Sequence, residues 1–371
     1  MALYGRLLLL LTITTALEVH SQSDLQSEKR YAILDNDWLA VGFLPFLLAM
    51  KGGMEVLGLA SDTGNSWQKQ CGLHALANLE VGNLNCIPVY QGATWPLLNT
   101  PDRFQAWESV HGKVPFPGAF GPRNITAEQQ GKNPASGDPD RIVEEAFVEG
   151  LPNATFNNST NAASFMVQMV HKYPHQVSIY AAGALTNVAL AVRMDPSFAT
   201  LAKELVFMGG YVDVNMLQAT GDMTQANINS DINLMADPEA AKIAVTADFP
   251  EIIIAGNVAN QVHSSQEYLD EVYRVKSPFT RLFHDHYGTK FPFWDETAAA
   301  LMVDRSIALD TSDVYADVDI SYASPNYGSL RLYQEALKPS GVRKVKYVNR
   351  IDGDRLKSMM KQAMWDPPTC S

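Results

Sequence analysis

The stretch Tyr31-Ala32-Ile33-Leu34-Asp35-Asn36-Asp37 decides the fold. Its unbroken apolar run is typical of a strand that is buried on both faces, as in a parallel sheet. Two aspartates follow at the point where the strand ends. Because open α/β sheets bind ligands beyond the carboxyl ends of their strands, we expect Asp35 and Asp37 to lie at a binding site.

Apolar segments of strand length alternate with amphipathic segments of helix length along the chain. This alternation predicts an α/β fold, in which helices cover both faces of a mostly parallel open sheet. Further strands are predicted over 55–60, 87–90, 177–182, 204–208 and 251–255. Helices are predicted over 41–50, 66–81 with Ser66 as its cap, 162–171, 237–247, after Trp294, and over 354–364.

Residues from about 94 to 160 lack this periodicity and are rich in Pro, Gly, Asn and charged residues. A connection of this length is either a functional lid or a glycosylated surface insertion. No linker composition divides the chain. Residues 22–371 are therefore predicted to form a single domain that carries this loop-rich insertion.

The N-terminus has the pattern of an export signal. Arg6 precedes the apolar run 7–11, and Val19-His20-Ser21 carries short side chains at its first and third positions. We predict a signal peptide, 1–21, that is removed after Ser21. Four glycosylation sequons support a secreted, extracellular glycoprotein, and they begin at Asn124, Asn153, Asn157 and Asn158.

Composition narrows the class of partner. The net charge of -12 and the lack of a basic run argue against binding to DNA or RNA. No segment after the signal has the length and apolarity of a membrane span. A small neutral or cationic substrate fits better. The three cysteines, Cys71, Cys86 and Cys370, permit at most one intramolecular disulfide.

The Asp35-x-Asp37 pair is suited to hold a divalent cation and to position a water molecule, because hard cations take oxygen ligands. Ca²⁺ takes about six to eight of them, so other parts of the chain must contribute. An isolated pair of this kind more often caps the following helix or forms a loop hydrogen bond.

Four segments read together resemble the successive signatures of the inosine/uridine-preferring nucleoside hydrolase family. They are Ile33–Asp37, Ala182–Ala191 with its Gly-Ala-Leu-Thr-Asn, Val206–Gly210, and Asn233–Ala241 with its Asp-Pro-Glu-Ala-Ala. Trp294–Ala299 lies where that family has its late metal-binding aspartate. The resemblance covers most of the mature chain and implies a mixed-sheet, nucleoside hydrolase-like fold with a Rossmann-like core.

The resemblance also implies a Ca²⁺-dependent hydrolase that splits ribonucleosides, with purine or pyrimidine bases, into base and ribose. By position, Asp37 would be the catalytic residue that takes a proton from the attacking water. The implied metal ligands are Asp35, Asp37, Asp295 and the backbone carbonyl of Ala182. The implied substrate contacts are Asn65, Asp231, Asn233 and Asp295. Members are commonly dimers or tetramers, so a homo-oligomer is a further expectation.

The chain departs from the family's first motif, which usually runs Asp-x-Asp-Pro-Gly-x-Asp-Asp. Here Asp37 is followed by Trp38-Leu39-Ala40-Val41-Gly42, so one metal-binding and one ribose-binding aspartate are missing. Asp62 ends the neighbouring predicted strand, and we hypothesise that it replaces the missing metal ligand. The alternative is a loop aspartate that bonds to Gly64 or Asn65.

Trp294 stands where many members have a histidine that protonates the departing base. An indole has no acid chemistry in this range. Trp294 is therefore expected either to stack on the base or to be a core residue beside Phe291-Pro292-Phe293. His284 and His286 lie shortly before it and are candidate proton donors.

Three functions remain open on this basis. The leading one is nucleoside hydrolysis by metal-activated water. A catalytically silent protein that binds a nucleoside or another small ligand is the alternative, which the missing carboxylates favour. A hydrolase of a different sugar conjugate, with Trp38 and Trp294 reshaping the pocket, ranks last.

Overall fold

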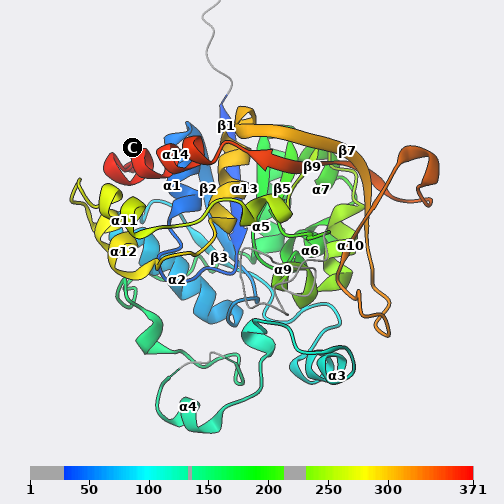
Figure 1. The fold of residues 1–371 in the computed structure, drawn as a ribbon, viewed down its shortest axis with the longest axis horizontal. Coiled ribbons are helices and arrows are strands. Elements are labelled where there is room, and N and C mark those ends of the chain that lie inside the picture. Colours follow the sequence, from blue (N-terminus) through cyan, green and yellow to red (C-terminus); the bar gives the residue numbers. More distant parts are fainter. Residues whose placement is uncertain (1–28, 133–135, 213–230, 371) are drawn as a thin grey trace, which may run out of the picture.

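The computed structural model describes residues 29–132, 136–212 and 231–370, and the predicted signal peptide lies outside them. Within these ranges one nine-stranded sheet has the order β3-β2-β1-β4-β5-β6-β9-β7-β8 (Figure 1). The strands are β1 (Arg30–Asn36), β2 (Met54–Ser61), β3 (Val89–Gln91), β4 (Val177–Ala181), β5 (Glu204–Met208), β6 (Ile252–Ala255), β7 (Ala308–Val318), β8 (Leu330–Tyr333) and β9 (Arg343–Ile351).

The sheet is mixed and mostly parallel, as predicted. β1 lies between β2 and β4, and each of these neighbours runs parallel to it. The parallel part continues from β3 across to β9. Only β7 runs against its neighbours, β9 and β8. The central position of β1 buries the six residues after Arg30, which fits the continuous apolar run in its sequence.

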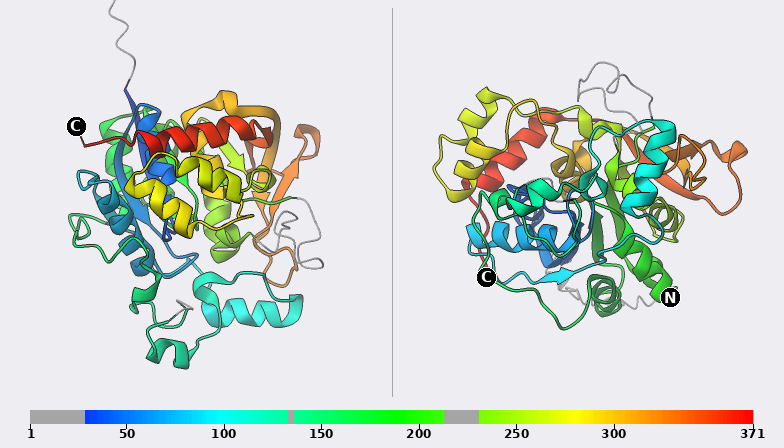
Figure 2. Two further views of the ribbon diagram at one scale, coloured as in Figure 1. Left: turned by 60° about the vertical axis from the view of Figure 1, so that its left-hand side comes forward. Right: turned by 90° about the horizontal axis from the view of Figure 1, so that it is seen from below.

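Helices cover both faces of the sheet, so the predicted fold class is confirmed (Figures 1 and 2). One face packs against α1, α2, α13 and α14, and the other against α5, α6 and α10. The helices are α1 (Leu44–Lys51), α2 (Gln68–Val81), α3 (Pro101–His111), α4 (Ile125–Gln129), α5 (Ala162–Lys172), α6 (Thr186–Met194), α7 (Phe198–Leu201), α9 (Ile232–Ala236), α10 (Pro238–Val245), α11 (Gln266–Val272), α12 (Pro278–His286), α13 (Trp294–Val303) and α14 (Gly353–Trp365).

Helix α2 begins later than predicted. Its N-cap residue is Trp67, and no side chain of that residue caps it, so the expected cap at Ser66 is wrong. Instead, the hydroxyl of Thr63 accepts a hydrogen bond of 2.9 Å from the backbone N–H of Gln68. Thr63, in the polar turn after β2, therefore accepts a hydrogen bond from a backbone N–H in the first turn of α2 that has no partner within the helix.

The insertion at 94–160 contains helices that its composition did not reveal. Thr100 accepts a hydrogen bond from the backbone N–H of Arg103, and Pro101 opens α3. Asn124 caps α4 in the same way through Ala127. Both starts follow standard capping chemistry, which a search for apolar periodicity overlooks. The prediction of a loop-rich segment is therefore only partly right.

The insertion lies at the end of the sheet where the parallel strands finish, below the sheet in Figure 1. Its residues bond to the turns that follow these strands. The N–H of Ala119 donates to the carbonyl of Gly64 at 2.9 Å, and the N–H of Leu97 donates to Asp237 Oδ2 at 2.8 Å. The insertion is thus fixed over the edge of the sheet that the sequence identifies as the binding edge.

A disulfide joins Cys86 to Cys370, and Cys71 is free and buried. This agrees with the limit of one intramolecular bridge. Among the described residues, no helix has both the length and the apolar character that crossing a membrane requires.

The disulfide is expected to stabilise the fold because it links residues 284 positions apart and so restricts the unfolded chain. Replacing Cys86 and Cys370 together by serine should lower the free energy of unfolding by about 2–5 kcal/mol. Denaturant unfolding of the oxidised wild type and of the double variant measures this. An unchanged midpoint would show that the bridge contributes nothing.

Candidate active site

The neighbouring strands β1 and β2 place acidic residues at the same end of the sheet, beside the end of β4. In the sheet, Asp35 of β1 lies opposite Ala60 of β2 and Ala181 of β4. Asp37 follows β1, and Asp62 follows β2 directly. The side chains of Asp35, Asp37 and Asp62 are almost completely buried. The topology thus brings three carboxylates together, two of them from the predicted pair and the third from the predicted substitute.

Asn187 holds Asp35 in place from the start of α6. Its Nδ2 donates to Asp35 Oδ1 at 2.8 Å and to the carbonyl of Ser61 at 3.1 Å. Its Oδ1 accepts a hydrogen bond of 2.8 Å from the N–H of Ala93. One amide therefore ties together the ends of β1 and β2 and the residue that follows β3. Its motif was recognised in the sequence, but this role was not.

Asp37 is enclosed by backbone on two sides. Its Oδ2 accepts a hydrogen bond of 2.6 Å from the N–H of Asn65. A β-carbon on Gly64 would lie 2.2 Å from the same oxygen, and one on Gly183 would lie 2.4 Å from Asp62 Oδ1 and 2.7 Å from the N–H nitrogen of Asp37. The two glycines are thus required for the carboxylates to approach the backbone so closely.

Asp295 joins the same group from the first turn of α13. Its Oδ2 accepts a hydrogen bond of 3.0 Å from Asn36 Nδ2, across 259 residues of sequence. The hydroxyl of Tyr180 donates to its backbone carbonyl at 3.1 Å. Asn36 is a second site residue that the sequence did not identify, although its place between two aspartates at a strand end was a usable signal.

Burial destabilises the charged form of all four carboxyl groups, and neighbouring carboxylates add to this effect at Asp37 and Asp62. Burial raises the pKa of Asp35 to about 7, and a hydrogen bond from Asn187 opposes the rise. Burial also raises the pKa of Asp295 to about 6. For Asp37 and Asp62, burial and then the neighbouring carboxylates raise the pKa well above the ordinary range. Such shifts are typical of active sites.

Several oxygens at this site are buried and have no hydrogen-bond partner among the described residues. They are Asp35 Oδ2, Asn36 Oδ1 and both carboxylate oxygens of Asp62. An unsatisfied buried acceptor costs free energy, so this cluster is poised for a ligand that supplies positive charge or hydrogen-bond donors. The described side chains do not form a ready-made metal site of three or more His, Cys, Asp or Glu groups.

Asp231 and Asn233 lie beside the glycine pair that follows β5. Asp231 accepts hydrogen bonds from the backbone N–H groups of Gly210 and Tyr211, and it caps α9. Asn233 Nδ2 donates to the carbonyl of Met208 at 3.2 Å. Burial raises the pKa of Asp231 to about 6. Both residues thus shape this turn, and their predicted contacts with ribose remain predictions.

The two tryptophans have different environments. Trp38 is completely buried, and its Nε1 donates to the carbonyl of Ala60 at 2.7 Å. It belongs to the core, so the idea that it reshapes the pocket is wrong. Trp294 is half-buried, and its Nε1 donates to Asn260 Oδ1 at 2.8 Å.

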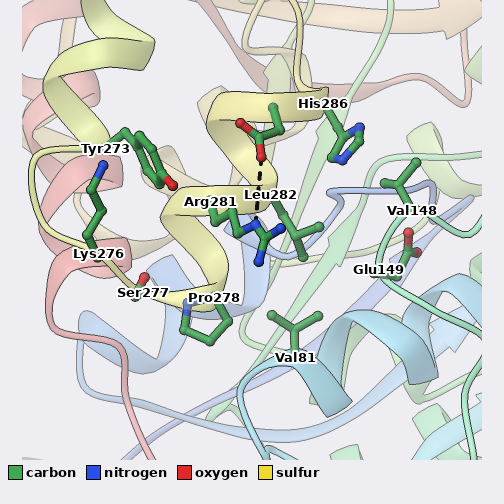
Figure 3. Close-up of a pocket in the computed structure, with 11 residues that line it drawn as sticks. Val81, Val148, Glu149, Tyr273, Lys276, Ser277, Pro278, Arg281, Leu282 and His286 are labelled. Carbon is green, nitrogen blue, oxygen red and sulfur yellow. Dashed lines mark ion pairs between the residues drawn. The ribbon is translucent and has the colours of Figure 1, made fainter.

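The two histidines do not join the carboxylate cluster. His284 bonds to Asp270 and Asp285 and stacks on Tyr273, on the outer side of α12. His286 lines a separate surface pocket of about 850 Å³ between α12 and the end of α2 (Figure 3). The expectation that either histidine supplies a proton is therefore not supported. None of the four carboxylates lines that pocket, which we do not take as the active site.

Fold and site together define an α/β protein with a buried acidic site at the carboxyl ends of its parallel strands. The family model described as inosine-uridine preferring nucleoside hydrolase matches residues 32–358. The chain belongs to this family. Members are N-glycosyl hydrolases, so the catalytically silent alternative is not favoured.

Individual relatives agree with this assignment. "Uncharacterized protein C800.11" of Schizosaccharomyces pombe is 35% identical over 353 residues, which are 91% of this chain and 85% of that protein. "Probable uridine nucleosidase 1" of Oryza sativa subsp. japonica is 30% identical over 264 residues, covering 71% and 69%. The solved structure "Plant nucleoside hydrolase - PpNRh1 enzyme" shows the same fold, with a TM-score of 0.69, 21% identity, and coverage of 91% and 99%.

The buried carboxylates predict how stability depends on pH when no divalent cation is added. The folded protein binds protons more tightly than the unfolded chain, because the pKa of Asp35 rises from 3.8 to about 7. The free energy of unfolding should therefore fall as pH rises from about 4 to about 7. Denaturant unfolding at a series of pH values tests this. Asp35→Asn should flatten the slope, and greater stability at pH 8 than at pH 5 would contradict the prediction.

Proposed function

We propose that this protein hydrolyses the N-glycosidic bond of ribonucleosides to free base and ribose, with water as the nucleophile. The observation that carries the proposal is the convergence of the buried Asp35, Asp37 and Asp62 with the partly buried Asp295 at one end of the sheet. Family membership supplies the reaction class. Carboxylates suit this chemistry because bond breaking at C1′ develops positive charge on the ribose.

In this proposal Asp37 accepts the proton of the attacking water, and Asp295 lies on the ribose side. The hydrogen bond from Asn36 fixes the orientation of the Asp295 carboxylate. The N–H of Asn65 fixes that of Asp37 and leaves its other oxygen for water. These backbone and amide donors hold both carboxylates before substrate arrives, so little reorganisation accompanies the reaction.

The donor set fits a hard divalent cation, for which we propose Ca²⁺. Unpartnered oxygens of Asp35 and Asp62 are the type of ligand that Ca²⁺ takes, and they would be joined by Asp37, Asp295 and the carbonyl of Ala182. A bound cation would lower the pKa of a water molecule and stabilise the charged carboxylates. Because the side chains are not yet arranged as a metal site, they would turn toward the cation on binding.

Asp62 takes the place of the missing aspartate in this proposal. Both of its oxygens are buried and neither bonds to Gly64 or Asn65, since the backbone N–H that favours its charged form is that of Ala184. The pKa of its carboxyl is raised by burial and by Asp35, Asp37 and Asp295, which places it within the electrostatic reach of all three. These facts favour the substitution over the loop alternative.

The Asp62 proposal predicts a loss of cation binding that is separate from any loss of folding. Asp62→Asn should weaken Ca²⁺ binding at least about tenfold, since one charged ligand is lost. It should also make the cation-free protein more stable, because a buried charge repulsion is removed. Calorimetric titration with Ca²⁺ and thermal unfolding measure the two effects. Asp354→Asn, at an exposed position of α14, is the control, and unchanged binding in Asp62→Asn would refute the substitution.

The catalytic proposal predicts release of free base from inosine, uridine or adenosine by the purified protein. Asp37→Asn should reduce turnover at least about 1,000-fold, because it removes the proton acceptor. The assay is chromatography of the released base, with and without Ca²⁺. Nucleoside binding without any base release by the wild type would contradict hydrolysis.

We further propose that the protein is secreted and glycosylated. The disulfide supports an oxidising compartment. Asn124, Asn153 and Asn158 are exposed, as glycan acceptors must be. Asn157 is only partly exposed, and its Nδ2, the atom that a glycan would modify, donates to the hydroxyl of Tyr90 at 3.3 Å. Asn153 Nδ2 also donates, to Glu80 Oε2 at 3.4 Å, so exposure is what separates the sites. Because Asn157 is less exposed than Asn153 and Asn158, we assign glycosylation in this stretch to the latter two.

Expression in a glycosylating eukaryotic host tests export. The secreted protein should begin at Gln22, and enzymatic removal of N-glycans should lower its mass. Asn157→Gln should leave the glycan mass unchanged, whereas Asn153→Gln and Asn158→Gln should each reduce it. Retention of the protein in the cell with residues 1–21 intact would contradict secretion.

A further inference from the structure

Asn260 ends the short 3₁₀ helix η5 (Asn257–Asn260), which follows β6. The residue is 7% exposed, so it is more than nine-tenths buried. Its Oδ1 accepts the hydrogen bond from Trp294 Nε1 at 2.8 Å. Its Nδ2 has no hydrogen-bond partner that meets standard geometry among the described residues.

The contact with Trp294 fixes which way the amide faces. An indole N–H only donates, so the atom that it contacts must be the amide oxygen. The NH₂ group is thereby turned away from Trp294 and is available as a donor. An amide carries two N–H donors, and the contact with Tyr211 uses at most one of them, so the site gains when a ligand supplies an acceptor for the other.

The surroundings place this donor next to the carboxylate site. The Asn260 side chain hydrogen-bonds to the hydroxyl of Tyr211, whose pKa is raised by burial and then by Asp231, with a smaller contribution from Asp295. Trp294, its indole partner, directly precedes Asp295 in the chain. Asn260 therefore lies close to the carboxylate site through its contacts with Trp294 and Tyr211.

The chemistry of this side differs from that of the carboxylates. Asp35, Asp37, Asp62 and Asp295 accept hydrogen bonds when ionised, which suits the hydroxyl groups of a ribose. Asn260 bonds to the half-buried Trp294, whose ring lies against the exposed ring of Phe291, with the two ring centroids 4.8 Å apart. A flat ring with an acceptor atom at its edge fits such a place, and a nucleobase has that form.

We propose that Asn260, oriented by Trp294, donates a hydrogen bond to the departing base and selects bases that present an oxo group or an unprotonated ring nitrogen there. This inference rests on the proposed nucleoside hydrolysis. As the C1′–N bond breaks, its electron pair leaves with the base, and the hydrogen bond stabilises the charge that develops. Asn260 keeps both amide protons, Asp37 takes a proton from the attacking water, and the base takes its proton from solvent.

The test compares substrates whose leaving groups do and do not need a hydrogen bond to stabilise their developing charge. Inosine and uridine carry poor leaving groups, whereas 4-nitrophenyl β-D-riboside releases a phenolate that is stable by itself. Asn260→Ala should lower kcat for the nucleosides about 100-fold, the usual cost of losing one donor to a developing charge. For the nitrophenyl riboside the loss should stay below about threefold, since that leaving group needs no donor.

Two further variants separate this role from a structural one. Trp294→Phe keeps an aromatic ring but removes the N–H that orients Asn260, and it should lower nucleoside turnover about tenfold with little effect on the nitrophenyl riboside. Asn257→Asp lies in the same turn and keeps the oxygen that contacts Val212 and Tyr347, so it should preserve turnover of both substrates.

The outcomes are distinct. Equal losses on both substrates in Asn260→Ala, or no loss on either, would overturn the role of Asn260 while nucleoside hydrolysis stood. A wild type that cleaves none of the substrates would overturn the proposed function, and this inference with it. Thermal unfolding of each variant confirms that a selective loss does not come from a damaged fold.

Discussion

The structure depends on burying Asp35, Asp37 and Asp62 together, with the partly buried Asp295 beside them, at the end of a parallel sheet. Hydrophobic burial of the strands on both faces is what forces Asp35 and its neighbours out of water. Burial raises the pKa of each of these carboxyl groups, and repulsion from neighbouring carboxylates raises the pKa of Asp37 and Asp62 further. A cluster of carboxylates that is unfavourable for folding is typical of a binding or catalytic site.

Amide side chains hold these carboxylates in place without neutralising their charge. Asn36 and Asn187 each donate to one oxygen of a carboxylate and leave another acceptor nearby without a partner. A lysine or arginine in their place would fill the site with a fixed charge. The insertion completes the enclosure, because Ala119 and Leu97 fasten it to the turns that follow β2 and α9. Its firm attachment favours a fixed wall over a free lid.

Sequence predicted the parts of the fold in which one physical signal dominates. β5 was predicted with its correct bounds, since its apolar run is short and sharply bounded. β7, β8 and β9 were missed, because their partly exposed residues alternate weakly and their pairing is antiparallel. Helix α3 was missed for a similar reason, as its signal is a cap and a proline in a polar segment.

The residues of the candidate site also fall into those that the sequence predicts and those that it does not. Asp35, Asp37 and Asp295 could be identified because they stand in recognisable segments. Asn36 and Asn260 could not, since their roles are set by partners far away in the sequence. The partner of Asn36 is 259 residues away, and only the folded sheet brings them together. Local sequence therefore specifies the charged groups, and the tertiary structure specifies the groups that orient them.

Trp38 and Asp62 are connected through the end of β2. Trp38 follows Asp37 directly and fills the core, and its indole N–H binds the carbonyl of Ala60 near the end of β2. The next residue, Ser61, is held by Gln68 through its hydroxyl and by Asn187 through its carbonyl. Asp62 thus follows a strand end that the side chains of Trp38, Gln68 and Asn187 hold in place. Trp38, which follows Asp37 where the family's usual motif continues differently, thus helps to position Asp62, the carboxylate that we propose as a metal ligand.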